Sequence, residues 1–120
     1  MPSASRDILL FLEDMQRCCE KVMLWTAQRT LEEFAADELL YDAVLMNLEV
    51  LGEAAKRVPV DLRLRYPAVD WRGVAGFRDV AAHFYFGLSV NIVWSIVTTD
   101  VPQLAAVLPA ILAAEQAIGR

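Results

Sequence analysis

The stretch from Asp37 to Pro59, DELLYDAVLMNLEVLGEAAKRVP, has the pattern of one long helix. Asp37 is suited to cap a helix over about 38–57, and Pro59 is suited to end it. Apolar residues occur around much of its circumference, which favours burial on more than one side. They are Leu39, Leu40, Ala43, Val44, Met46, Leu48, Val50, Leu51, Ala54 and Ala55. Gly52 interrupts this band at a cost of about 1 kcal/mol relative to alanine, so we expect another helix to approach closely there.

Helices are also predicted before this stretch. Apolar residues recur at helical spacing over about 5–28, and Ser3 or Ser5 is suited to cap that helix. Thr30 and Glu33 have the spacing of a capping box, which predicts a short helical turn before the long helix.

The second half of the chain is also predicted to be helical. The elements expected there are a short turn over 61–65, a helix from Trp71 to about His83 or Phe84 capped by Asp70, a helix over 90–98 capped by Ser89, and a helix over 100–117 kinked by Pro109. Gly73 and Gly76 weaken the helix that begins at Trp71 and predict a tight contact or an irregular first turn. With no strand-like alternation, we expect one all-α domain over residues 1–120, an up-down bundle of four to five helices.

The composition predicts a homodimer. Hydrophobic residues make up 57% of the chain, above the share of about 45–50% that is usual for soluble domains. A domain of 120 residues has too much surface relative to its volume to bury all of them alone. A subunit interface is the simplest place for the excess.

No targeting, membrane or metal signal accompanies this excess. The longest apolar stretch, Val101 to Ala114, contains two prolines and is too short to span a bilayer. The first seven residues lack the apolar core of a signal peptide. Two adjacent cysteines and one histidine cannot supply the usual four zinc ligands. We therefore expect a cytoplasmic protein with reduced thiols, no metal and no membrane contact.

Charge is distributed unevenly along the chain. The net charge of −5 argues against a general nucleic-acid-coating protein. Residues 54–80 nevertheless carry six bases and three acids, a balance of +3, whereas residues 1–53 have a balance of −7. The basic segment fits either a local anion site or a solvated loop.

The basic segment leads into GFRDVAAHFYFG, residues 76–87, which contains the single histidine of the chain. The Arg78 guanidinium can donate two parallel hydrogen bonds to a phosphate, and His83 can transfer protons near neutral pH. Together they suit cleavage of RNA, whose 2′-hydroxyl is an internal nucleophile. Five residues turn a helix by about 140°, so the two side chains do not share one face. One copy also supplies only one proton-transfer group, whereas a twofold dimer would supply two.

The chain resembles the HepT-like toxins of the HEPN superfamily over about residues 7–112. The resemblance rests on Arg78, four residues, His83, one residue and Tyr85, together with Gly52-Glu53-Ala54-Ala55 and Val93-Trp94. It implies a HEPN-like fold and a metal-independent endoribonuclease that needs no cofactor. It also implies a homodimer with the active site at the dimer interface. The RNA products would end in a 2′,3′-cyclic phosphate and a 5′-hydroxyl.

The resemblance also implies residue roles and a partner. Arg78 would hold or polarise the phosphate, His83 would act as general acid or base, and Asp79 would orient one of them. The partner would be an MntA-like nucleotidyltransferase antitoxin, which neutralises the toxin by adding AMP units to the motif tyrosine, here Tyr85.

Simpler interpretations exist for the same residues. His83 alone would be a structural histidine, Arg78 and Asp79 would pair with other helices, and Tyr85 would be an interface aromatic. Glu53 would be a packing residue that faces the motif helix. The alternative function is a non-catalytic helical dimer that binds or regulates a nucleotidyltransferase.

Overall fold

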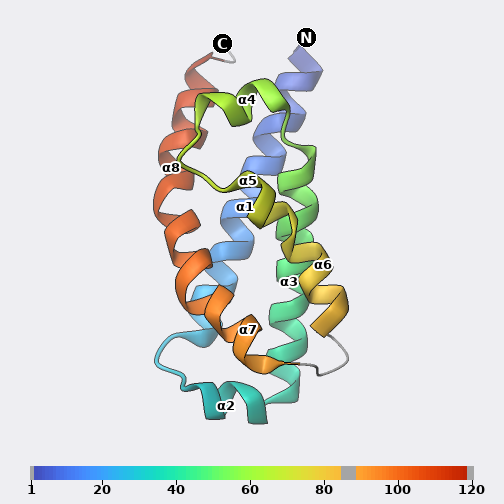
Figure 1. Cartoon of the computed structure of the whole chain (residues 1–120). Helices are drawn as coiled ribbons and strands as arrows, with labels where there is room; N and C mark the ends of the chain where they lie inside the picture. Colours follow the sequence, from blue (N-terminus) through green and yellow to red (C-terminus); the bar gives the residue numbers. More distant parts are fainter. Residues whose placement is uncertain (1, 85–88, 119–120) are drawn as a thin grey trace.

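A computed structural model describes residues 2–84 and 89–118, with side chains for 6–82 and 89–118. The described residues form an all-α bundle without strands, which measures 47 × 26 × 22 Å. Its long helices are α1 (Pro2–Thr26), α3 (Glu38–Arg57) and α8 (Val101–Ile118), which lie side by side in Figure 1. The shorter helix α2 (Leu31–Ala36) closes one end, and α4 (Val60–Arg65) crosses the other end, where both termini lie. The all-α prediction is confirmed.

Short helices complete the bundle on the side of α3 and α8. Helices α5 (Trp71–Ala75) and α6 (Phe77–Phe84) both pack against α3. Helix α7 (Val90–Ser95) and the π-helical segment η1 (Ile96–Asp100) lead directly into α8.

The predicted caps explain where α2 and α3 begin. The Glu33 amide donates to Thr30 Oγ1 at 3.1 Å, and the Thr30 amide donates to Glu33 Oε1 at 2.9 Å. The Leu40 amide donates to Asp37 Oδ1 at 3.0 Å. Both caps therefore form as their spacing predicts.

The predicted cap of the first helix is wrong. Helix α1 already includes Pro2, so Ser3 and Ser5 lie inside its first turns. Proline is favoured at the start of a helix because its missing N–H would have no intrahelical partner there. Ser89 does stand at the N-cap of α7, but its side chain makes no capping hydrogen bond.

The break predicted near residue 99 is also wrong, because Val90 to Ile118 form one continuous helical run. At η1 the hydrogen bonds widen, and the Val101 amide donates to the carbonyl of Ile96, five residues earlier. This π turn lies directly before Pro102, which has no N–H to give. Pro109 lies inside α8, and the helix continues on both sides of it.

This run also changes the expectation about membranes. It has 29 residues, and its most apolar window has mean hydropathy 1.6, so by length and composition alone it could cross a bilayer. The core helix of a soluble protein can have the same composition, and α8 packs against α1. The prediction from Val101 to Ala114 alone underestimated the length of the apolar helix.

Two polar anchors hold α4 to its neighbours. Arg63 donates through Nε to the carbonyl of Val58 at 2.9 Å and through Nη2 to that of Ala55 at 2.8 Å, which satisfies carbonyls at the end of α3. Arg65 Nη2 lies 2.6 Å from Glu115 Oε1 in α8. Tyr66 adds a hydrogen bond of 2.6 Å to the same carboxylate.

The two cysteines are buried in the core and are free thiols. Burial, followed by the neighbouring charges of Cys18 and Glu20, raises the pKa of Cys19 to about 12. Both residues therefore serve as core packing residues.

Candidate active site

The helix that carries the motif begins at a break in the chain. Asp70 accepts a hydrogen bond of 3.0 Å from the Gly73 amide and so caps α5. At Gly76 the chain leaves α5, and the amides of Asp79 and Val80 donate to the Gly76 carbonyl at 3.0 and 3.1 Å. The single helix predicted over 71–84 is therefore two short helices. The break allows α6 to take its own direction along α3.

Gly52 brings α6 against α3, as its place in the sequence predicted. A Cβ atom at Gly52 would lie 2.6 Å from the backbone nitrogen of Arg78 and 3.0 Å from the carbonyl oxygen of Ala75. The first of these distances is shorter than real Cβ atoms show, and its partner is a backbone atom that cannot move without moving α6. Only glycine therefore allows the first turn of α6 to lie where it does.

The neighbour of that glycine holds the Arg78 side chain. Arg78 Nη1 lies 3.1 Å from Glu53 Oε2, and Arg57 Nη2 lies 3.5 Å from Glu53 Oε1. The Oε2 atom is buried and accepts no well-directed hydrogen bond from the described residues. Its contact with Arg78 is therefore an ion pair based on charge, and about half of the Arg78 side chain stays exposed at 47%.

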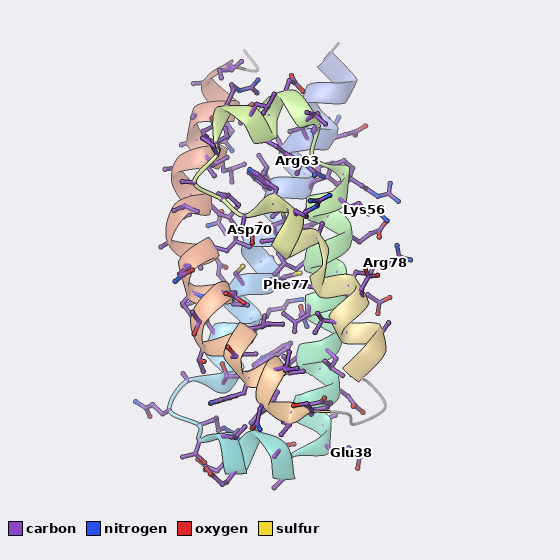
Figure 2. All side chains as sticks on the ribbon, in the orientation of Figure 1. Glu38, Lys56, Arg63, Asp70, Phe77 and Arg78 are labelled. Atoms are coloured by element: carbon purple, nitrogen blue, oxygen red, sulfur yellow. The ribbon has the colours of Figure 1, made fainter. Side chains whose placement is uncertain are left out.

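Figure 2 shows that the first two side chains of α6 point in different directions. Phe77 points into the bundle and is buried, whereas Arg78 points outward beside α3. The apolar residue thus anchors the helix and leaves the guanidinium at the surface.

Arg78 opens onto a pocket of about 350 Å³ that extends over α3 to α1. Arg57 lies in the same pocket, with its guanidinium carbon 5.9 Å from the centre of the Phe11 ring. The lining residues are Phe11, Asp14, Glu49, Val50, Glu53, Ala54, Arg57 and Arg78. Two guanidinium groups therefore face one hollow, with Glu53 between them.

A larger pocket of about 460 Å³ lies between α5 and α8. Its charged groups are Asp70 and Asp100, and burial, followed by the charge of Asp70, raises the pKa of Asp100. Among the described residues, no basic side chain lines this pocket, so nothing in it offsets the repulsion between its carboxylates and a phosphate. The smaller pocket also contains carboxylates, those of Asp14, Glu49 and Glu53. It has in addition the guanidinium groups of Arg57 and Arg78, which can bind a phosphate, and it therefore suits an RNA backbone better.

The remaining motif residues are placed only in part. His83 lies in the last turn of α6, five residues after Arg78, and its side chain lies outside the described residues. Tyr85 lies outside the described residues altogether. Asp79 is exposed in the first turn of α6, and its expected role in orienting a neighbour stays a prediction.

Two neighbours of Arg78 were not predicted to belong to the site. Glu53 was expected to face the motif helix as a packing residue, and it does face that helix but as an ion-pair partner. From the sequence, Arg57 is only one of the bases of the basic segment. Its spacing of four residues from Glu53 is the signal that could have identified the pair. Among the described side chains, no three His, Cys, Asp or Glu residues form a metal-binding group.

The fold and the site together define a class of protein. It is an all-α bundle that carries an arginine and a histidine on one short surface helix. A family model described as "Ribonuclease HepT-like" matches residues 15–111 of this chain. The chain therefore belongs to the HepT-like ribonuclease family of HEPN proteins.

Similar proteins carry related names. "Putative RNase MJ0127" of Methanocaldococcus jannaschii is 39% identical over 97 residues, which cover 81% of this chain and 80% of the relative. "Probable ribonuclease HepT" of Thermococcus cleftensis is 36% identical over 94 residues, which cover 78% of this chain and 86% of the relative. None of the solved structures matches this chain significantly.

Proposed function

We propose that this chain is a metal-independent endoribonuclease that acts as the toxin of a toxin–antitoxin pair and works as a homodimer. The observation that carries the proposal is the position of Arg78, which Gly52 and Glu53 hold at the surface on the same short helix as His83. The ribonuclease names of the relatives support the same substrate class.

In the proposed reaction the RNA supplies its own nucleophile. The 2′-hydroxyl loses a proton and its oxygen forms a bond to phosphorus, while the bond from phosphorus to the 5′-oxygen breaks and that oxygen gains a proton. The products are a 2′,3′-cyclic phosphate and a 5′-hydroxyl. His83 transfers protons, and Arg78 stabilises the negative charge that develops on the phosphate.

The ion pair with Glu53 is compatible with this role of Arg78. A guanidinium has five N–H donors in a planar fork, and one contact with a carboxylate leaves donors for a phosphate. Because each chain contributes one histidine, a dimer that brings two copies of α6 together supplies both an acid and a base.

The proposed toxin is tested by removing each reacting side chain. We expect Arg78→Ala and His83→Ala to lose RNA cleavage by a factor of about 10²–10⁴ and to lose growth inhibition. Arg72→Ala removes a similarly exposed arginine from α5 and serves as the matched control. Cleavage at the wild-type rate by either motif variant, with helical content unchanged by circular dichroism, would show that the assigned chemistry is wrong.

The proposed antitoxin is an MntA-like nucleotidyltransferase that modifies Tyr85. The tyrosine hydroxyl would attack the α-phosphate of ATP and release pyrophosphate, which leaves AMP on the ring oxygen. Incubation with the cognate nucleotidyltransferase and ATP should add mass in AMP steps, and Tyr85→Phe should prevent the addition. A wild-type chain of unchanged mass would remove this regulatory part of the proposal.

A further inference from the structure

The pocket onto which Arg78 opens carries charges of both signs, and they are separated along α3. Glu49, Glu53 and Arg57 follow one another at intervals of four residues, so they lie one turn apart on the same side of the helix. Arg57 and Arg78 both contact Glu53, and Glu49 lies one turn away toward the start of α3. A simple anion would therefore meet carboxylates in this pocket, and a simple cation would meet guanidinium groups.

Asp14 of α1 belongs to the acidic end of the pocket. Helices α1 and α3 run in opposite directions (Figure 1). The Arg57 guanidinium lies over the Phe11 ring, so Asp14, about one turn after Phe11 on α1, lies toward Glu49 on α3. The pocket therefore has guanidinium groups at one end and two carboxylates at the other.

The two carboxylates at the acidic end are available to a ligand. Asp14 and Glu49 are exposed, and neither has a hydrogen bond or an ion pair with another described residue. Glu53, in contrast, is shared between two arginines. The three acids do not form a metal-binding group in the part of the chain that the structure describes. Asp14 and Glu49 can therefore accept hydrogen bonds from N–H groups of a bound molecule.

Apolar side chains line the same pocket. Phe11 is half-buried, Val50 is 45% exposed, and Ala54 lies one turn after Val50. The volume of about 350 Å³ is in the range of small-molecule sites. A flat ring with apolar faces and a polar edge fits such a pocket, and a nucleobase is a ring of this kind.

We propose that this pocket binds the nucleobase next to the cleaved bond of the RNA, and that Asp14 and Glu49 select a base with N–H donors, guanine above all. The inference rests on the proposed function, which places the phosphate at Arg78. A nucleotide then matches both ends of the pocket, because it has a negative phosphate and a base edge that donates hydrogen bonds.

The order of preference follows from the edges of the four bases. Guanine presents N1–H and its 2-amino group side by side, so it can donate two parallel hydrogen bonds to one carboxylate, as a guanidinium does. Adenine and cytosine each present one amino group on this edge. Uracil presents one N–H between two carbonyl oxygens, which the carboxylates repel. We therefore expect guanine to bind best and uracil to bind worst.

Base preference is measured with short RNAs that differ only in one nucleotide beside the cleaved bond, on each side of the bond in turn. At one of the two positions, we expect a kcat/KM about tenfold higher with guanosine than with uridine. Asp14→Asn and Glu49→Gln should each lower this ratio, and the double variant should bring it close to one, because an amide offers N–H donors as well as an oxygen. A general effect of charge would change cleavage of all the RNAs alike and leave the ratio unchanged.

Asp42→Asn is the matched control. It removes the same charge from an exposed position on α3 that does not line the pocket, and we expect the wild-type ratio. A wild-type ratio close to one at both positions, a preference that the double variant retains, or a preference that Asp42→Asn also removes would overturn the inference.

Binding separates this inference from the proposed function. Fluorescence anisotropy measures the affinity for the same RNAs with a 2′-deoxynucleotide before the cleaved bond, which lack the nucleophile. A wild type that cleaves none of the RNAs but binds the guanosine form about tenfold more tightly than the uridine form, with the difference lost in the double variant, would refute the proposed function and support the base site. Cleavage without base preference would refute the base site and leave the function supported. Absence of both cleavage and binding preference would overturn both.

Discussion

At the scale of single residues, the site depends on having glycine, which has no side chain, at position 52. Gly52 has no Cβ atom, and for that reason the backbone of Arg78 can lie against α3. The same close approach places Arg78 beside Glu53. A change at Gly52 should therefore affect both folding stability and the position of the guanidinium.

We expect Gly52→Ala to lower the free energy of unfolding and to reduce RNA cleavage. Alanine gains about 1 kcal/mol in helix propensity, but forcing extra atoms into a packed contact costs about 1–3 kcal/mol, and here the obstacle is backbone. Urea unfolding followed by circular dichroism measures the change.

Gly76→Ala is the matched control for this prediction. The φ angle of Gly76 is −67°, which alanine adopts readily, and its nearest contact would be 3.2 Å from the Gly73 carbonyl oxygen. We expect a stability close to that of the wild type. Equal stability of the Gly52 and Gly76 variants would contradict the role given to Gly52.

The sequence predicted the close approach at Gly52 but not the ion pair that accompanies it. A glycine inside an apolar helical band indicates a contact whatever its partner. Glu53 and Arg78 are 25 residues apart in the sequence and lie on two different helices. Their pairing depends on how these helices pack against each other, which local sequence patterns do not encode.

At the scale of helices, α8 is joined to the connector after α3 by one buried carboxylate. Glu115 is buried and receives hydrogen bonds from Arg65 and Tyr66. Burial raises the pKa of this carboxyl group, but the hydrogen bonds from Arg65 and Tyr66 outweigh that effect, so that the pKa is lowered overall. A lowered pKa in the folded state means that Glu115 stabilises the fold above its unfolded pKa of about 4.3 and loses this effect as pH falls through the folded value.

We expect Glu115→Gln to cost about 1–2 kcal/mol at pH 7, and we expect this difference to shrink as the pH falls through the lowered pKa of the folded carboxyl group. Urea unfolding at pH 7 and at a series of acidic pH values measures the difference. Asp61→Asn removes another partner of Arg65 at 3.6 Å, but that pair is exposed and should contribute less than about 0.5 kcal/mol. A Glu115→Gln effect that is independent of pH would contradict the assigned protonation.

The helix boundaries that were predicted wrongly are those that depend on nonlocal or unusual bonding. Asp37 and Asp70 form their caps because the side chain and the amide are three residues apart. The π turn at η1 escaped prediction because Asp100 and Pro102 have the pattern of a new helix, whereas the chain widens its hydrogen bonds and continues. The break at Gly76 was indicated only as an irregularity.

At the scale of the whole molecule, the proposed homodimer would explain both the apolar excess and the single histidine. The excess predicts a subunit interface, and the folded chain leaves apolar side chains of α3 exposed, among them Val50, which lines the pocket of Arg78. In the proposed homodimer, a second copy would complete a site for which one chain has only half of the proton-transfer groups. The dimer itself stays a prediction.

End-group analysis of the cleaved RNA tests the central claim most directly. The wild-type protein should cleave RNA in the presence of EDTA and leave a 2′,3′-cyclic phosphate and a 5′-hydroxyl. A substrate with a single 2′-deoxynucleotide before the cleaved bond should resist cleavage, because the internal nucleophile is gone. Products with a 3′-hydroxyl and a 5′-phosphate, or equal cleavage of the deoxy-substituted substrate, would contradict the account.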